Sequence, residues 1–333
     1  MKALVVSTPG SVAVVTIDEP SVGANDVAVA PLLSGMCGTD LELIDGTIDP
    51  AFVRYPLVLG HEWVGRLLND VDGVANAGEH VVAEGLIPCE ACAECRSGNS
   101  NRCTTYDEIG FTRPGALAER IVVPKRLVHR LEDTVDVADA AFIEPMAVVW
   151  RALTRIPLRS SLRVAIVGDG TIALLCAHLV RLFDPETVVV VGRRKAQGQL
   201  AEAAGANEFL TVAPNASFDL IIEAAGNASS VLSALSLAAR GAMVILLGLP
   251  VHGTKIEVAP DDFVNNDLIL QGSFSYTREA FARVVAEVNA GRLKPSFLIT
   301  HRFSLDESTH AIDALRGRVP DSVARGKVVV TVS

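Results

Sequence analysis

The stretch Val164-Ala165-Ile166-Val167-Gly168-Asp169-Gly170-Thr171-Ile172-Ala173 joins a continuous apolar run to the start of a helical pattern. An apolar run without alternation is typical of a strand that is buried on both faces of a parallel sheet. Strands are also predicted downstream at 187–191, 220–222, 243–247 and 268–270, with helical patterns between most of them. This alternation predicts an α/β fold whose second half is a doubly wound parallel sheet.

The turn after the first of these strands has the form Gly-x-Gly-x-x-Ala. Gly168 permits a tight turn, Gly170 lets a phosphate approach the backbone, and Ala173 allows the helix to pack closely on the strand. The N–H groups at the helix N-terminus attract an anion, so the acidic Asp169 is expected to point away from it. We therefore predict a dinucleotide site whose contacts include Gly168, Asp169, Gly170, Thr171 and Ile172.

The end of the second strand indicates which nucleotide binds. NAD enzymes usually carry an acidic residue there for the ribose hydroxyl, but this chain has Gly192-Arg193-Arg194. The small Gly192 leaves space for a 2′-phosphate, and the two arginines can neutralise that phosphate. We predict that NADP(H) is preferred over NAD(H); the alternative is that both arginines are solvated surface residues.

Four cysteines stand close together in the first half of the chain. Cys89, Cys92, Cys95 and Cys103 have the spacing C-x2-C-x2-C-x7-C. Four thiolates can close a tetrahedral zinc shell with no open position, which predicts a structural zinc lobe at 88–104. An iron–sulfur cluster is the other metal site that four thiolates support.

A second set of residues has the chemistry of a catalytic zinc site. Gly60-His61-Glu62 places an imidazole beside a carboxylate, Cys37 lies upstream and Glu144 lies downstream. Such sites use about three protein ligands of these types and keep one position open. Each residue alone is weak evidence for a metal site, because a single cysteine, for example, is usually a buried structural thiol. The combination predicts a zinc site if the fold brings these residues together.

Composition excludes several classes of protein. The chain has 333 residues, of which 50% are hydrophobic, so it can form two domains with sizeable cores. Its formal net charge is −10 and it has no basic block, so we expect neither nucleic acid nor a membrane surface as a partner. No signal peptide or membrane-spanning stretch is visible, and we expect a cytoplasmic protein without disulfides.

Together these residues resemble the zinc-dependent medium-chain dehydrogenase/reductase superfamily, which contains the alcohol and polyol dehydrogenases. The resemblance covers essentially the whole chain and rests on the order of the motifs. The segments 106–112 and 142–145 look most like the polyol, sugar and cyclitol dehydrogenase branch. The similarity to bacterial aminocyclitol and galactitol-phosphate dehydrogenases is weaker and covers local stretches.

The resemblance implies a split architecture. A mostly β, partly open GroES-like barrel would take 1–145 and 277–333, and a Rossmann-type dinucleotide domain, 146–276, would be inserted into it. The active site would lie between the two domains. The strand at 267–272 could pair across a two-fold axis, which gives a homodimer or homotetramer.

The resemblance also implies roles for single residues. Cys37, His61 and Glu62 would hold one catalytic zinc, and Glu144 would ligate it directly or through water, so the choice of glutamate stays open. Asp40 would orient the metal-bound histidine, and Thr39 would touch the substrate oxygen. Further nucleotide contacts would be Gly226, Leu247, Gly248 and Ser273.

These roles imply an enzyme that interconverts a secondary alcohol and its ketone by hydride transfer to NADP. Zinc would lower the pKa of the alcohol, and Thr39 would receive its proton. A carboxylate stands where the simple-alcohol enzymes have a second cysteine ligand, which favours a polyol, sugar, cyclitol or aminocyclitol. The alternatives are an NADPH-dependent ketone or aldehyde reductase of a biosynthetic pathway, acting on a simpler alcohol, and a non-catalytic NADPH-binding sensor.

Overall fold

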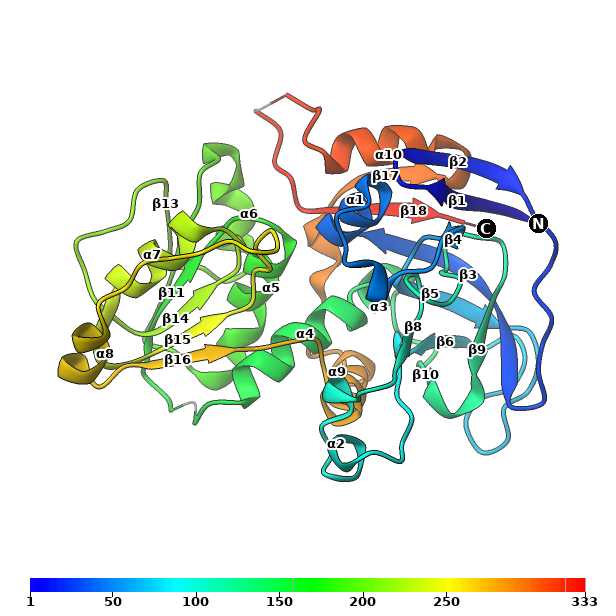
Figure 1. Cartoon of the computed structure of the whole chain (residues 1–333), viewed down its shortest axis with the longest axis horizontal. Helices are drawn as coiled ribbons and strands as arrows, with labels where there is room; N and C mark the ends of the chain where they lie inside the picture. Colours follow the sequence, from blue (N-terminus) through cyan, green and yellow to red (C-terminus); the bar gives the residue numbers. More distant parts are fainter. Residues whose placement is uncertain (158, 321, 333) are drawn as a thin grey trace. The chain divides into compact units, whose positions relative to one another are not determined.

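The computed structural model describes residues 1–157, 159–320 and 322–332, and it divides into two compact units, both drawn in Figure 1. The first unit is Met1–Ala147, Tyr276–Val319 and Lys327–Ser333, and the second is Val148–Ser275 and Pro320–Gly326. The domain ranges read from the sequence stay a prediction. Residues 158, 321 and 333, which those ranges include, lie outside the described residues.

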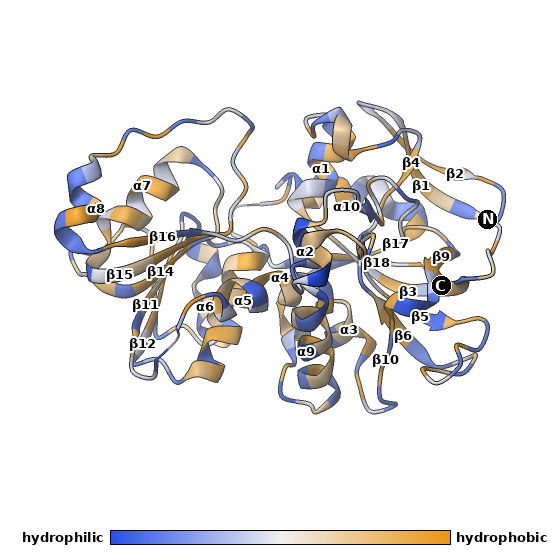
Figure 2. Ribbon diagram, turned by 60° about the horizontal axis from the view of Figure 1, so that its bottom comes forward, coloured by the Kyte–Doolittle hydropathy of each residue, from blue (hydrophilic) through white to orange (hydrophobic). Residues whose placement is uncertain are grey.

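The second unit is built on a six-stranded sheet with the order β13-β12-β11-β14-β15-β16, in which every pair is parallel. The central strand β11 is buried on both faces, as its apolar sequence predicted, and Figure 2 shows the apolar colour along these strands. The predicted doubly wound parallel sheet is therefore confirmed. The strands are β11 (Arg163–Val167), β12 (Thr187–Val191), β13 (Glu208–Leu210), β14 (Phe218–Glu223), β15 (Ala238–Leu246) and β16 (Ile269–Gly272).

Helices cover this sheet. The strand order reverses at β11, so right-handed crossovers place the helix after β11 and the helix after β14 on opposite faces. The strand β13 and the helices α7 and α8 were not predicted from the sequence. The helices of this unit are α4 (Ile143–Thr154, which starts in the first unit), α5 (Thr171–Val180), α6 (Gly198–Ala203), α7 (Ala228–Ser236) and α8 (Pro260–Asn266).

The first unit contains a three-stranded sheet, β2-β1-β4, and a seven-stranded sheet, β10-β6-β5-β3-β18-β17, in which β9 also pairs with β3. A two-stranded sheet, β7-β8, completes it. The strands are β1 (Lys2–Thr8), β2 (Ser11–Thr16), β3 (Asp26–Met36), β4 (Leu57–Val58), β5 (Glu62–Leu67), β6 (His80–Ala83), β7 (Leu86–Ile87), β8 (Asp107–Glu108), β9 (Ile121–Pro124), β10 (Val128–Arg130), β17 (Ile299–Ser304) and β18 (Lys327–Thr331).

Short helices lie between these strands. They are α1 (Gly38–Asp45), α2 (Ala93–Arg96), α3 (Val137–Ala140), α9 (Arg278–Asn289) and α10 (Ser308–Leu315). None of the helices in the described ranges is both long and apolar enough to cross a bilayer.

The register of three strands gathers side chains that are far apart in the sequence. Gly35 at the end of β3 pairs with Glu62 at the start of β5, and Met36 pairs with Val328 in β18. Cys37, Glu62 and Lys327 are therefore neighbours. A Cβ at Gly35 would collide with the ends of the Glu62 and Lys327 side chains, so glycine here leaves room for their ion pair.

Candidate functional site

Cys37, His61 and Glu62 form a close group in the first unit. One ligand atom from each lies within 4.8 Å of the others, and Cys37 Sγ is 3.0 Å from His61 Nε2. His61 and Glu62 are buried, whereas Cys37 is half-buried. Thiolate, imidazole and carboxylate are the ligand types of a catalytic zinc site, and three protein ligands leave a position open. The chemistry and spacing of these residues therefore fit a zinc ion.

Two buried charged residues hold this group in place. Asp40 Oδ1 lies 3.5 Å from His61 Nδ1, and Asp40 Oδ2 accepts a hydrogen bond from the Cys37 N–H at 2.9 Å. The Lys327 ammonium forms an ion pair with the Glu62 carboxylate. A carboxylate behind a ligating histidine fixes which ring nitrogen faces the metal.

The charges in the group shift several pKa values. Burial alone would lower the pKa of His61, but Cys37 and Asp40 raise it well above its usual range. Burial also acts to lower the pKa of Lys327, but the nearby Glu62, Cys37 and Asp40 raise that pKa above its ordinary value. The group is therefore dominated by negative charge, which a metal cation would balance.

Glu144 and Thr39, which were also predicted for this site, are not members of the close group. Burial raises the pKa of Glu144 to about 8, and Glu62 acts in the same direction, whereas His61 opposes it. Among the described residues the close group includes Glu62 and not Glu144. Thr39, in α1, is half-buried, and its hydroxyl makes no hydrogen bond to a described residue.

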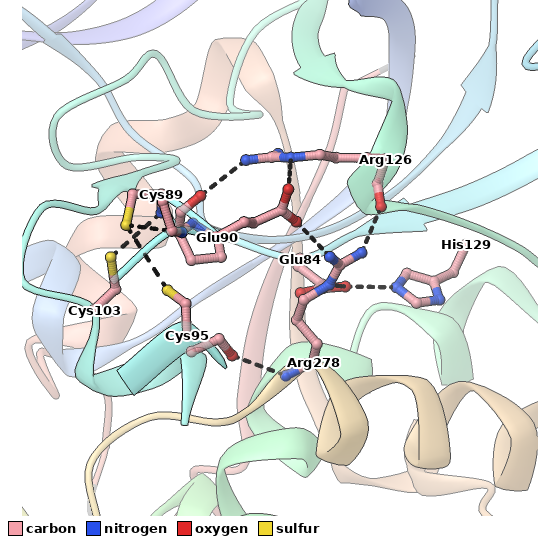
Figure 3. Close-up of polar contacts among 11 residues, drawn as sticks. Glu84, Cys89, Glu90, Cys95, Cys103, Arg126, His129 and Arg278 are labelled. Carbon is pink, nitrogen blue, oxygen red and sulfur yellow. Dashed lines mark hydrogen bonds and ion pairs between the residues drawn. The ribbon is translucent and has the colours of Figure 1, made fainter. Parts of the chain in front are cut away.

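The four clustered cysteines are brought together as their spacing predicted. Their sulfur atoms all lie within 4.8 Å of one another, and Cys89 Sγ is 4.0 Å from Cys95 Sγ. Figure 3 shows Cys89, Cys95 and Cys103 of this cluster. A tetrahedral zinc with Zn–S bonds of about 2.3 Å requires sulfur separations of roughly 3.8 Å. Backbone N–H groups of Ala91 and Cys92 help to lower the pKa of Cys89 to about 6. The four residues fit a closed tetrahedral metal site.

A charged network ties this lobe to the rest of the first unit (Figure 3). Arg126 Nε lies 3.2 Å from the Glu90 carboxylate, and Arg278 contacts the same carboxylate at 2.5 Å. Arg278 also lies 3.3 Å from buried Glu84, which pairs with His129 at 3.1 Å. The lobe is therefore held by ion pairs that do not involve the cysteines.

The predicted nucleotide contacts share one edge of the parallel sheet in the second unit. Residues 168–172 follow β11, 192–194 follow β12, Gly226 follows β14, Leu247 and Gly248 follow β15, and Ser273 follows β16. The carboxyl ends of parallel strands are where α/β sheets bind ligands.

The start of α5 fits a phosphate. Gly170 is the N-cap and offers no side-chain acceptor to the first N–H groups of the helix. The space where a Cβ of Gly170 would project is open. The first turn therefore has free donors and room for an anion.

Gly192 lies close to the turn that follows β11. A Cβ on Gly192 would collide with Asp169 Cβ at 2.5 Å and with the Phe209 ring at 2.8 Å. The missing side chain therefore allows the close approach of Asp169, and a contact of Gly192 with a 2′-phosphate stays a prediction.

Asp169 turns toward the end of the second strand. Its carboxylate accepts hydrogen bonds from the N–H groups of Arg193 and Arg194 at 2.9 and 3.0 Å. The Arg194 guanidinium binds it at 2.7 Å, and these contacts lower the pKa of Asp169 despite its burial. Arg193 is exposed, and its guanidinium makes no hydrogen bond or ion pair with a residue that the structure describes. The two arginines are therefore not equivalent.

Lys327 was not predicted as a partner of the close group of Cys37, His61 and Glu62. The available signal was a lysine at the start of the otherwise apolar run 328–330, because a buried lysine needs a partner charge.

The sequence matches two known domain families. Residues 23–133 match the alcohol dehydrogenase GroES-like domain, and residues 138–323 match the glucose dehydrogenase C-terminus. An L-threonine 3-dehydrogenase of Anaeromyxobacter sp. (strain Fw109-5) is 30% identical over an alignment of 328 positions, which covers 93% of this chain and 93% of that protein.

Solved structures with this fold cover the whole chain. One from Sinorhizobium meliloti 1021, provisionally described as a zinc-binding dehydrogenase and bound to NADP, has 29% identity and a TM-score of 0.91 over 99% of both chains. Galactitol-1-phosphate dehydrogenase from Escherichia coli has 28% identity and a TM-score of 0.87 over 100% of both chains. The latter similarity extends well beyond the local stretches noted in the sequence. The chain therefore belongs to the zinc-dependent medium-chain polyol and alcohol dehydrogenase family, and it is an oxidoreductase.

Proposed function

We propose that this enzyme interconverts a secondary alcohol of a polyhydroxylated substrate and the corresponding ketone, with NADP(H) as the preferred nucleotide. The close group of Cys37, His61 and Glu62 beside buried Asp40 and Lys327 is the observation that carries this proposal. The carboxylate in the ligand set supports a substrate with several hydroxyls over a simple alcohol.

The proposed roles follow from the contacts of each side chain. A zinc ion at Cys37, His61 and Glu62 supplies Lewis-acid chemistry, which makes an alcohol hydroxyl more acidic. Asp40 keeps the His61 ring in one orientation, and the ion pair with Lys327 fixes the position of the Glu62 carboxylate. In this proposal the Thr39 hydroxyl takes the alcohol proton and passes it toward solvent. The nicotinamide supplies the hydride acceptor.

We assign a second, structural zinc to Cys89, Cys92, Cys95 and Cys103. Four thiolates leave no open position for substrate, and the lobe has its own ion pairs to the surrounding unit. The expected content is thus two zinc ions for each chain.

The nucleotide preference rests mainly on Arg193. Because Asp169 already binds Arg194, we expect Arg193→Ala to raise KM for NADP roughly tenfold or more, the worth of one charge-assisted hydrogen bond. KM for NAD should stay nearly unchanged. Initial rates with both nucleotides measure this, with Lys195→Ala as the control for a nearby exposed cation. Equal changes for NADP and NAD would argue against a 2′-phosphate contact.

The experiment that tests the function is nicotinamide turnover by the zinc-loaded protein on polyols, cyclitols, aminocyclitols and simple secondary alcohols, with NADP and with NAD. Oxidation of polyhydroxylated substrates with NADP preferred is expected. Turnover of simple alcohols alone would contradict the substrate class, and a preference for NAD would contradict the nucleotide. Activity only with ketones and NADPH would favour the biosynthetic reductase.

We also propose a homodimer that pairs through the edge strand β16. Ile269 and Leu270 on this strand, and Val264 on the preceding helix α8, are exposed apolar side chains. An exposed apolar edge strand is a site for pairing with another chain. Sedimentation equilibrium tests this, and a monomer at micromolar concentration would contradict it.

A further inference from the structure

The Asp169 side chain stands inside the glycine turn after β11 and reaches the end of the neighbouring strand β12. Asp169 is 9% exposed, and its Oδ2 accepts the N–H groups of Arg193 and Arg194. Gly192 makes this approach possible, since a Cβ there would lie 2.5 Å from Asp169 Cβ. NAD enzymes usually carry their ribose-binding acid at the end of the second strand. In this chain, the turn after the first strand supplies a carboxylate there.

The Arg194 guanidinium binds Asp169 through two of its nitrogens. Nε lies 3.3 Å from Asp169 Oδ2, and Nη2 lies 2.7 Å from Oδ1 and 3.1 Å from the Asp169 carbonyl oxygen. Arginine binds a phosphate most specifically through parallel N–H groups on two different nitrogens. Because Nε and Nη2 are both engaged, Arg194 cannot offer such a pair of donors while it is bound to Asp169.

The charge of Asp169 acts in the same direction. Burial would raise the pKa of this carboxyl, but the hydrogen bonds from the Arg194 guanidinium and from the N–H groups of Arg193 and Arg194 lower it below its ordinary value. The carboxylate is therefore ionised at neutral pH, and it offsets the charge of Arg194. Arg193 is exposed and its guanidinium is not engaged by a described residue, so it can meet a 2′-phosphate without breaking an existing contact.

The turn that carries Asp169 is also held by contacts that do not use the carboxylate. The Gly168 N–H donates to the Val191 carbonyl at 2.8 Å, and the buried Gln197 amide donates to the Asp169 carbonyl. The same amide donates to the Arg325 carbonyl at 3.0 Å and accepts the Arg325 N–H at 2.6 Å. We therefore expect the turn to keep its shape when the Asp169 charge is removed.

We propose that Asp169 determines nucleotide specificity by keeping the Arg194 guanidinium away from a 2′-phosphate, which limits the discrimination between NADP and NAD. The enzyme then discriminates mainly through Arg193. This inference rests on the proposed preference for NADP, because it concerns the same end of the nucleotide.

Asp169→Asn tests the proposal with little change of shape, because the amide oxygen can still accept the N–H groups of residues 193 and 194. We expect Kd for NADPH to fall roughly tenfold, as for one new charge-assisted hydrogen bond, and Kd for NADH to change about twofold at most. Titration of the zinc-loaded protein with each nucleotide, followed by nucleotide fluorescence, measures both constants without turnover. An unchanged ratio of the two constants would overturn the proposal.

Two further variants test whether the effect passes through Arg194. Arg194→Ala alone should change Kd for NADPH about twofold at most, because the engaged guanidinium contributes little to phosphate binding. Combined with Asp169→Asn, it should abolish the gain in NADPH affinity, which makes a double-mutant cycle. A large loss of NADPH affinity in Arg194→Ala alone would overturn the proposal, since Arg194 would then bind the phosphate already. The full gain in the double variant would also overturn it, since Asp169 would then act by its charge alone.

Asp219→Asn is the matched control. The Asp219 carboxylate binds Arg163 through Nε and Nη2, both at 3.1 Å. Arg163 begins β11, so this pair lies at the edge of the parallel sheet opposite the glycine turn. The variant should leave both dissociation constants nearly unchanged. A gain in NADPH affinity equal to that of Asp169→Asn would assign the effect to net charge and overturn the proposal.

The same titrations distinguish failure of this proposal from failure of the proposed NADP preference. If the wild-type protein binds NADH more tightly than NADPH, the preference is contradicted, but a shift in Asp169→Asn that requires Arg194 still supports the role of Asp169. If the wild-type protein prefers NADPH and Asp169→Asn leaves the ratio unchanged, the preference stands and the role of Asp169 is overturned.

Discussion

Cys37→Ser is expected to lower kcat by about a thousandfold and to remove one of two zinc ions, while NADP still binds. Mutation of a residue that only hydrogen-bonds to a metal ligand typically lowers metal affinity or activity roughly 10- to 100-fold. Loss of a ligand itself should therefore lower kcat by more than that. Cys37 Sγ lies 3.0 Å from His61 Nε2, and no other thiol of the described chain belongs to this group. A serine hydroxyl is a far poorer zinc ligand than a thiolate.

Zinc content by mass spectrometry, kcat, and NADP binding by fluorescence measure this result. Cys176→Ala is the matched control, because that thiol is buried in α5 and belongs to neither metal group. It should keep both zinc ions and nearly all activity. A Cys37→Ser protein with two zinc ions and full turnover would refute the ligand assignment.

Lys327→Met is expected to lower the free energy of unfolding of the metal-free protein by about 3–5 kcal/mol, the usual cost of leaving one charge of a buried pair alone. Lys327 is 1% exposed and Glu62 is 2% exposed, so water cannot replace the lost ammonium. Zinc binding should recover part of the loss, because the cation also neutralises Glu62.

Urea unfolding with and without chelator measures the change. Lys2→Met is the control, since Lys2 makes an ion pair with Asp306 at 2.8 Å on an exposed surface, where such pairs contribute little. A Lys327→Met protein that is as stable as the Lys2→Met protein would show that Glu62 does not carry a buried charge.

The parallel sheet could be predicted because its signals are local. The run at 164–167 and the turn after it specify a buried strand and a helix start within ten residues of sequence. The helices α7 and α8 were missed because α7 mixes serine with its apolar residues and the short α8 is rich in aspartate and asparagine. Their helical state depends on caps and on packing, which a short window does not contain.

The site could be predicted only where residue chemistry itself was distinctive. Cys37, His61 and Glu62 stood out by type, and the register of β3 and β5 explains why they meet. The close packing of Gly192 against Asp169 and Phe209 could not be predicted, because these neighbours are distant in the sequence. Lys327 could not be predicted, because the residue that it pairs with, Glu62, is far away in the sequence.

The position of β18 inside the seven-stranded sheet has a consequence for biosynthesis. This strand lies between β3 and β17, and its residues leave the ribosome after those of every strand of the parallel sheet. The six-stranded parallel sheet can therefore form during translation. The seven-stranded sheet of the first unit is incomplete at that time, because β3 lacks its neighbour β18. Until β18 arrives with Lys327, the Glu62 side chain stays without its counter-charge, so the metal group is among the last parts of the nascent chain to reach its final form.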